Sequence, residues 1–271
     1  MSRPGSGPIQ WRQYVIVLGL LAATPTSITG CSPTTSTPTL SIFAAASLRA
    51  PFEALAQTFE SEHKDVQLKL NFAGSQVLRF QISRGAPADL FASANPVHLQ
   101  ALLAQEKLTP PHVFAGNRLA IVVPRVTKSS VSSPATLTMA KHLVLGTEAS
   151  PIGQYSRQYL RRAAKVFGKD FYKQVMNQVA SLETNVRLIL TRVELGAADA
   201  GIVYETDALR SQNVRVIPIP VSANVMARYS MATVTRTKSA AWAEKWRDFV
   251  LSDTGQRILV RHGFIGFHDT R

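Results

Sequence analysis

In the first part of the chain, segments with the hydrophobic pattern of a strand alternate with segments that have the spacing of a helix. An apolar, strand-like run at 39–45 is followed by Leu48, Phe52, Leu55 and Phe59, which recur at helical spacing. The same order returns twice, with strands expected at 66–72 and 88–92 and helices at 75–84 and about 96–106. Strands that alternate with helices favour right-handed parallel crossovers, so the pattern predicts an α/β lobe.

The second half of the chain predicts another α/β lobe. The run at 119–124 is continuously apolar, which suits either a strand buried on both faces or a crossover between lobes. The elements expected after it are strands at 142–146 and 200–204 and helices at about 153–167, 169–179 and 185–195. Two further runs, 214–220 and 226–234, are expected to return the chain to the first lobe. Trp242, Trp246 and Phe249 share a face of the terminal helix, where we expect core packing.

Ser47 and Ser75 each follow an apolar strand and precede a helical pattern, so each is predicted to be an N-cap. This arrangement would place two hydroxyls and two helix N-termini at one edge of a sheet. Helix N-termini bind anions through backbone N–H groups, without any positively charged side chain. Pro51 lies close to the first helix start and leaves that boundary open by a residue or two.

The N-terminus has the features of a targeting segment. Arg3 and Arg12 accompany an apolar run at 14–23, which is too short to span a bilayer stably but typical of a signal peptide. Small residues then lead to Cys31 in a pattern that resembles a bacterial lipobox. We therefore expect residues 1–30 to be a lipoprotein signal peptide, Cys31 to carry lipid, and residues 31–39 to form a polar tether. A free thiol beside an ordinary signal-peptide site is the alternative. Cys31 is the only cysteine, so no internal disulfide can form.

Composition and motifs exclude several function classes. The 271 residues carry a formal net charge of +13, which invites a nucleic-acid interpretation. Lys and Arg are scattered, however, and no zinc finger, RNP-type or basic-helix pattern accompanies them, so we expect no nucleic-acid partner. No P-loop, nucleophile-elbow or HExxH motif is present, and the six histidines lack metal-ligand spacing.

A set of ordered motifs after residue 39 resembles the molybdate-binding proteins of ABC importers. The motifs are FAAASL (43–48), AGS (73–75), GAPADLFASA (85–94), FAGNRLAIVVP (114–124), PIGQY (151–155), TNVRLIL (184–190), GIVYETDA (201–208) and RHGF (261–264). The resemblance implies a two-lobed type II periplasmic binding protein fold. Each lobe would be a mixed, mostly parallel sheet flanked by helices, with the ligand in the cleft. The expected boundaries are 40–119 plus 225–271 for lobe 1 and 120–224 for lobe 2.

By the same resemblance, five positions would contact the oxyanion. Ser47 and Ser75 would each give a hydroxyl and a backbone N–H, Ile152 and Val186 a backbone N–H, and Tyr204 its phenol. Isoleucine at 152 and Gln76 after Ser75 depart from the smaller residues common in the family. The resemblance implies a monomer that binds molybdate or tungstate and delivers it to an ABC permease. It would act in the periplasm or at the cell surface of a bacterium, anchored in the membrane through Cys31.

Three alternatives stay open at this point. The same fold could capture another oxyanion such as sulfate or phosphate, and Asp207 or Glu183 could supply an acceptor near the site. An iron site would need several tyrosines or carboxylates, whereas only Tyr204 is placed in the cleft, with Tyr155 near it. An enzyme would need an acid–base pair, and none has convincing spacing. We therefore expect no catalysis, no cofactor and no direct metal-cation ligands.

Overall fold

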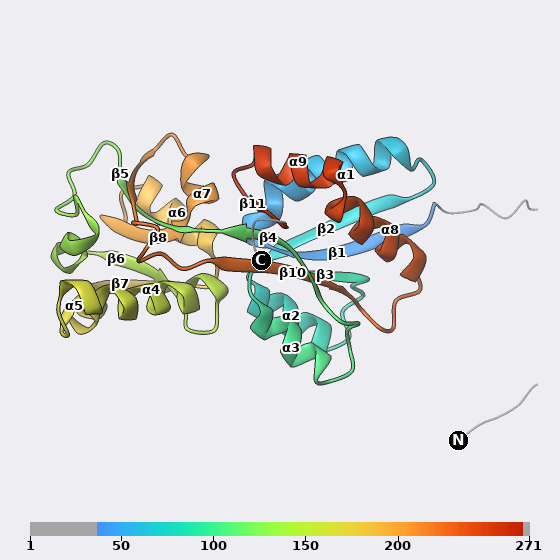
Figure 1. Cartoon of the computed structure of the whole chain (residues 1–271), viewed down its shortest axis with the longest axis horizontal. Coiled ribbons are helices and arrows are strands. Elements are labelled where there is room, and N and C mark those ends of the chain that lie inside the picture. The colour runs from blue at the N-terminus through green and yellow to red at the C-terminus, as the bar shows by residue number, and fades with distance from the viewer. Residues whose placement is uncertain (1–36, 268–271) are drawn as a thin grey trace, which may run out of the picture. The chain divides into compact units, whose positions relative to one another are not determined.

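The computed structural model describes residues 37–267, which contain two β-sheets with helices on both faces of each (Figure 1). Residues 37–267 belong to one compact unit with its own hydrophobic core, so this part of the chain is expected to fold without residues 1–36. The predicted signal peptide, Cys31 and the tether up to residue 36 lie outside the described residues. Within 37–267, every helix is too short or too polar to span a bilayer.

The first sheet has the strand order β11-β4-β10-β3-β1-β2. β1 pairs in parallel with both β2 and β3, and β10 pairs antiparallel with β3 and β4. Leu40, Ile42 and Ala44 of β1 are fully buried, as expected for an interior strand covered on both faces. The strands are β1 (Thr39–Ala45), β2 (Gln67–Ala73), β3 (Leu90–Ser93), β4 (His112–Asn117), β10 (Ala227–Thr233) and β11 (Ile265–Gly266).

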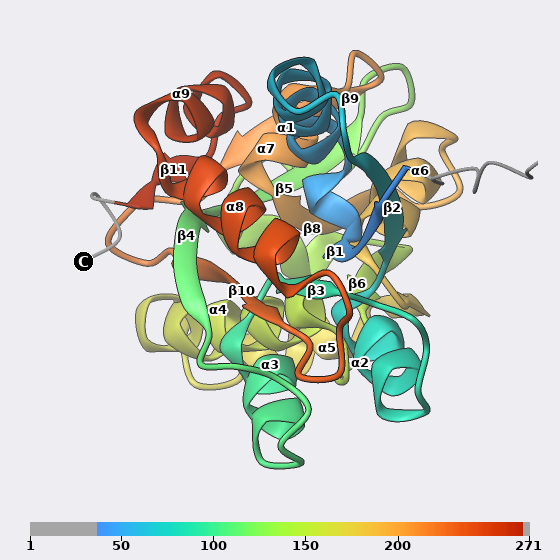
Figure 2. The ribbon, with the colours of Figure 1, turned by 90° about the vertical axis from the view of Figure 1, so that its right-hand side faces the viewer.

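Helices α1, α8 and α9 cover one face of this sheet, and α2 and α3 cover the other (Figures 1 and 2). Their bounds are α1 (Arg49–Glu62), α2 (Ser75–Ser83), α3 (Pro96–Leu103), α8 (Ala240–Leu251) and α9 (Asp253–Arg261). Trp246 is fully buried with its ring centroid 5.4 Å from that of Phe59 and 5.7 Å from that of Phe52. Trp242 packs partly buried against the same core. The predicted core role of these tryptophans is confirmed.

The second sheet has the order β7-β6-β8-β5-β9, with parallel pairs around β6 and antiparallel pairs around β5. Every residue of β5 is buried. Its strands are β5 (Leu119–Pro124), β6 (Leu143–Gly146), β7 (Val179–Glu183), β8 (Ala200–Tyr204) and β9 (Val214–Pro218). The helices of this lobe are η2 (Pro134–Met139), α4 (Pro151–Phe167), α5 (Phe171–Asn177), α6 (Val186–Glu194) and α7 (Glu205–Leu209).

One predicted element lies in the other sheet. We expected the run 214–220 to return the chain to the first lobe, but β9 pairs antiparallel with β5 at the edge of the second sheet. β9 is a short strand with only Val214 and Ile217 buried, and so few buried positions cannot say which sheet the strand joins. The return to the first sheet takes place along residues 219–226 instead.

The chain crosses between the sheets twice, at Arg118 and at 219–226. Asn224 ties the two crossings together, because its side chain accepts from the Leu119 N–H at 3.0 Å and donates to the Leu119 carbonyl at 2.9 Å. These two bonds reproduce the pairing of neighbouring β-residues just beyond Ala120 and Pro218, where the pairing of β5 with β9 ends. Asn224 therefore holds the two crossings side by side.

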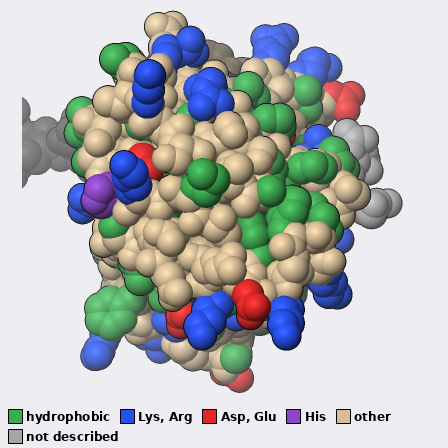
Figure 3. Space-filling view, turned by 90° about the vertical axis from the view of Figure 1, so that its left-hand side faces the viewer, with side chains coloured by type: hydrophobic (Ala, Val, Ile, Leu, Met, Phe, Trp, Pro, Cys, Tyr) green, Lys and Arg blue, Asp and Glu red, His purple; other side chains and the backbone are tan. Residues whose placement is uncertain are grey.

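Charged side chains are dispersed on the end of the second lobe that Figure 3 shows. Lys and Arg lie around the face, with Asp and Glu between some of them. The view contains no single basic surface of the kind that follows a nucleic-acid backbone.

Candidate functional site

A small cavity of about 20 Å³ lies between the two sheets. A single water needs a cavity of at least about 10–15 Å³, so this cavity suits one small ion rather than an organic metabolite. All five residues that the resemblance indicated line it: Ser47, Ser75, Ile152, Val186 and Tyr204. No charged side chain of residues 37–267 is part of its wall.

Ser75 is the first residue of α2, and Gly74, in an extended conformation, precedes the helix. The predicted N-cap role is therefore wrong, since no side chain caps this helix. The Ser75 Oγ instead accepts a hydrogen bond from the Ala94 N–H at 3.2 Å, at the end of β3. With its oxygen occupied as an acceptor, the hydroxyl hydrogen is available for an anion in the cavity.

Ser47 is also not an N-cap. It lies inside a short 3₁₀ turn, η1 (Ala46–Leu48), which continues into α1, and Ala45 occupies the cap position without a side-chain bond. The Ser47 Oγ lies 2.9 Å from the Tyr229 hydroxyl on β10. Both serines are thus oriented by tertiary partners rather than by their own helices.

The starts of α4 and α6 present free backbone donors. Ser150 caps α4 by accepting from the Gly153 N–H at 3.1 Å. Asn185 caps α6 by accepting from the N–H groups of the second and third helical residues. The N–H groups of Ile152 and Val186 are left outside these caps, in the first turns where no intrahelical acceptor exists. Both residues line the cavity, where the helix dipoles also favour an anion.

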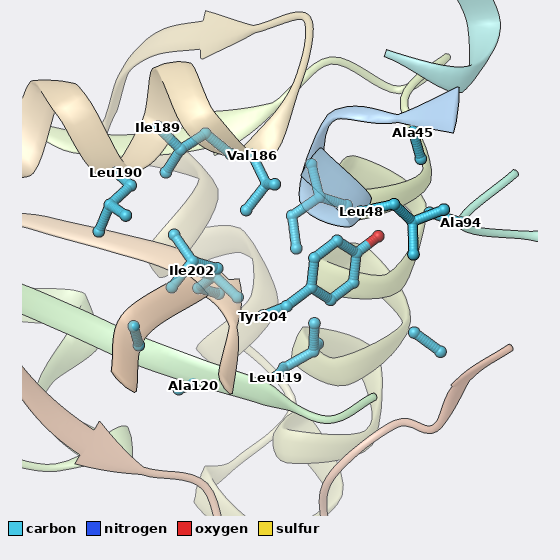
Figure 4. Close-up of a cluster of buried hydrophobic side chains, with 14 of the residues drawn as sticks. Ala45, Leu48, Ala94, Leu119, Ala120, Val186, Ile189, Leu190, Ile202 and Tyr204 are labelled. Carbon is cyan, nitrogen blue, oxygen red and sulfur yellow. The ribbon is translucent and has the colours of Figure 1, made fainter. Parts of the chain in front are cut away.

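Tyr204 ends β8 with its ring buried among apolar side chains, and its oxygen lies on the side of Ala45 and Ala94 (Figure 4). The hydroxyl makes no well-formed hydrogen bond within the described residues. Burial, together with the neighbouring Tyr229, raises the pKa of Tyr204 well above its usual value. The phenol therefore stays protonated at neutral pH and can donate a hydrogen bond.

The two candidate acceptors lie outside the cavity wall. Asp207 lines a neighbouring cavity that shares Ser47 with the first one, and its Oδ1 is 3.6 Å from the Arg187 guanidinium. Burial raises the pKa of Asp207 to about 7, against the opposing effect of Arg187. Glu183 pairs with Arg192 and does not reach the cavity.

The arrangement does not fit a metal-cation site. Residues 37–267 contain no group of three or more His, Cys, Asp or Glu side chains that could hold a metal ion. Tyr155, the second tyrosine considered for iron, accepts from the Arg228 N–H at 3.2 Å and is not part of the cavity wall. The wall offers hydrogen-bond donors, which bind anions.

Tyr229 and Asn224 are the residues that sequence reasoning missed. Tyr229 lies in a run, 229–233, that is buried throughout, so no alternation distinguishes it from core. Asn224 lies in an irregular segment with no periodicity at all. Neither position carries a local signal, because both act through partners more than 100 residues away.

The family model that matches the chain covers residues 40–265 and describes bacterial extracellular solute-binding proteins. The chain belongs to this family. Its two mixed sheets, flanked by helices, form the two-lobed α/β fold of periplasmic binding proteins.

Among relatives of known name, the molybdate-binding protein ModA of Mycobacterium tuberculosis H37Rv is 31% identical over 92% of this chain and 94% of its own length. YvgL of Bacillus subtilis, provisionally named as an ABC transporter substrate-binding lipoprotein, is 30% identical over 94% of this chain and 98% of its own.

Solved structures of lower identity show the fold alone. The periplasmic molybdate-binding protein of Azotobacter vinelandii is similar with a TM-score of 0.71 and 18% identity, over 83% of this chain and 98% of that one. The sulfate-binding protein SubI of M. tuberculosis gives 0.76 and 17%, over 86% and 88%. The fold is therefore shared by binding proteins for different oxyanions.

Proposed function

We propose that this protein binds molybdate outside the cytoplasmic membrane and delivers it to an ABC permease, and that tungstate binds as well. The observation that carries the proposal is the cavity between the lobes, whose five mapped residues offer only neutral hydrogen-bond donors. The ModA relative of M. tuberculosis supports molybdate as the ligand.

Neutral donors suit a tetrahedral dianion, because all four of its oxygens accept hydrogen bonds. Three hydroxyls and four backbone N–H groups would face it. Hydrogen bonds to a charged group contribute about 1.5–3 kcal/mol each, and desolvation and ordering offset much of this. We therefore expect a dissociation constant between micromolar and nanomolar, which corresponds to a binding free energy of about −8 to −12 kcal/mol.

Selectivity would come from size and protonation state. Monohydrogen phosphate carries an O–H that would find no acceptor in the cavity wall, and such a mismatch is penalised strongly. Sulfate is fully deprotonated like molybdate, so only its smaller radius separates the two. Sulfate is therefore the second candidate, and the likeness to a sulfate-binding protein shows that the fold permits it.

The proposed mechanism is binding without catalysis. Ser47 and Ser75 belong to elements of the first sheet, whereas Ile152, Val186 and Tyr204 belong to elements of the second. An anion that bridges both sets stabilises the closed arrangement by differential affinity. Residues 40–119 with 225–271 would move as one lobe and 120–224 as the other, about the two crossings joined by Asn224. The permease would then reopen the lobes and accept the anion.

The protein would be a monomeric lipoprotein anchored in a membrane, in the periplasm or at the cell surface of a bacterium. The lipobox-like sequence before Cys31 supports this, and the relative YvgL carries the word lipoprotein in its name. Residues 1–30 would be removed, and the segment up to residue 39 would connect the lipid to the binding lobes.

Calorimetric titration of residues 37–271 with molybdate, tungstate, sulfate and phosphate tests the proposal. Tight binding of molybdate and tungstate with no signal from sulfate or phosphate is the expected result. A preference for sulfate or phosphate would keep the transport role and change the ligand. No heat with any of the four would refute the oxyanion function.

A further inference from the structure

Two side-chain amides connect the lobes beside the cavity. Gln76, on α2 of the first lobe, donates from Nε2 to the Thr184 carbonyl of the second lobe at 2.6 Å. Asn95, just before α3, donates from Nδ2 to the Gln154 Oε1 on α4 at 2.9 Å. Both bonds join residues of the first sheet's lobe to residues of the second sheet's lobe. They can therefore exist only when the lobes are closed.

Neither amide is part of the cavity wall. Their bonds hold protein to protein and leave the anion's donors untouched. Gly74 shows how tightly the lobes meet at this point. A Cβ added there would lie 2.4 Å from the Thr184 carbonyl oxygen and 2.7 Å from the Gln76 Nε2. Close approach at Gly74 thus brings the Gln76 amide and the Thr184 carbonyl into hydrogen-bond range.

We propose that Gln76 and Asn95 form a latch that holds the lobes closed independently of the anion and so sets the closed fraction of the free protein. The latch extends the proposed function, because apparent affinity is the intrinsic affinity of the closed form multiplied by the fraction of molecules that are closed. Ligand release is also slower when the closed form has bonds that the anion does not supply. Gln76 and Asn95 are in this sense positioning residues, which act on affinity without contacting the ligand.

Each bond should change the closed-to-open ratio by about threefold to tenfold, the range of a single net hydrogen bond. When both bonds are lost, the two changes in the closed-to-open ratio should multiply, since the two amides lie on different elements and share no partner. The latch would keep part of the free protein closed, so a larger fraction of molecules would already be in the binding-competent form. It would also slow the opening that the permease must drive.

Spin-label distance measurements on the ligand-free protein test the latch directly. Residues 37–271 contain no cysteine, so Glu62→Cys on α1 and Lys173→Cys on α5 would give one label on each lobe. The distance distribution would be recorded for this labelled parent, for Gln76→Ala and for Asn95→Ala. Gln81→Ala is the matched control, because Gln81 lies on the same helix as Gln76 and its side chain bonds Asn71 within the first lobe.

The expected result is a closed population in the ligand-free parent, with a closed-to-open ratio that falls about threefold to tenfold in Gln76→Ala and Asn95→Ala and is unchanged in Gln81→Ala. Gln154→Ala should match Asn95→Ala, and the double variant of Asn95 and Gln154 should add nothing further, because the two residues share one bond. A parent that is fully open without ligand, or latch variants with the parent's distribution, would overturn the proposal. Circular dichroism checks that each variant is folded. Because no anion is present, the result stands whether or not molybdate is the ligand.

Discussion

The Ser47 Oγ lies 2.9 Å from the hydroxyl of Tyr229, a residue 182 positions further along the chain. Burial raises the pKa of Tyr229 well above its usual value, so its proton is retained at neutral pH. When Tyr229 donates to Ser47, the serine's own hydrogen is free to point into the cavity. Tyr229 thereby orients a proposed ligand contact from a strand that follows the second crossing between the lobes.

Tyr229→Phe should weaken molybdate binding about threefold to tenfold, because the serine loses the partner that orients it. The ring and its packing against Phe114 and Phe264 are kept, so the melting temperature should stay within a few degrees. Calorimetry with the variant checks this. Equal affinity in the two proteins would show that Ser47 needs no orientation.

Ser75→Ala should weaken binding at least tenfold. The substitution removes a hydroxyl donor to the dianion, worth about 1.5–3 kcal/mol, and leaves the Ala94 N–H without its acceptor. The helix start should survive, since Ser75 does not cap it. Affinity is measured by calorimetry and folding by circular dichroism. An unchanged dissociation constant would remove Ser75 from the site.

Gly74→Ala should weaken binding at least tenfold by keeping the lobes apart. Its φ of −61° and ψ of 138° are open to alanine, so the first lobe should fold normally. In the closed form, however, the new methyl group would meet the Thr184 carbonyl at 2.4 Å. Small-angle X-ray scattering with saturating ligand should show a more open molecule than the parent. A scattering profile as closed as that of the parent, with unchanged affinity, would show that the added methyl group does not keep the lobes apart.

Anion affinity should fall about threefold to tenfold as the pH rises from 6 to 8. Asp207 lines the neighbouring cavity, which has Ser47 in common with the anion cavity, and burial raises the pKa of Asp207 to about 7. Below that pH the carboxyl is mostly neutral, and above it the carboxylate repels a bound dianion. Titrations at pH 6, 7 and 8 measure the trend. Asp207→Asn should flatten it, and a profile that keeps its slope in this variant would assign the dependence to another group.

Stability should decrease by about 1–2 kcal/mol as the pH falls from 6.5 to 4, owing to His98. This residue of α3 is 5% exposed, and its pKa is lowered to about 4, first by burial and then by Arg79. Between these pH values the unfolded chain binds a proton that the folded chain does not, so protonation favours unfolding. Urea unfolding at pH 7 and pH 4.5 measures the difference. His98→Gln should reduce it.

Local periodicity predicted the elements that build the site. The strand expected at 39–45 is β1, the helix expected at 75–84 is α2 to within a residue, and the run at 119–124 is β5. These segments bury one face or both, so their apolar spacing carries the information directly. The start expected at Ser75 is confirmed, whereas Ser47 lies inside a 3₁₀ turn and α1 begins two residues after it. A serine near a helix start resembles a cap whether or not it bonds to the helix.

The five proposed contacts came from ordered motifs rather than from periodicity. Val186 and Ile152 have the spacing of ordinary core residues, and both are almost fully buried. Only their backbone N–H groups matter to an anion, and a backbone group has no signature of its own in the side-chain pattern. Their positions came from the resemblance, through the motifs PIGQY and TNVRLIL, and the structure adds the capping residues beside them, Ser150 and Asn185.

The sequence by itself determined the alternation of strands and helices and the buried faces, since each depends on residues within a few positions of one another. The tertiary structure decided the sheet that β9 joins, the pairing of Ser47 with Tyr229, and the contacts of Gln76 and Asn95 with the other lobe. These relationships join residues between 59 and 182 positions apart, or strands whose register is set only by packing. They depend on how the two lobes meet, which is a property of surfaces that no local pattern encodes.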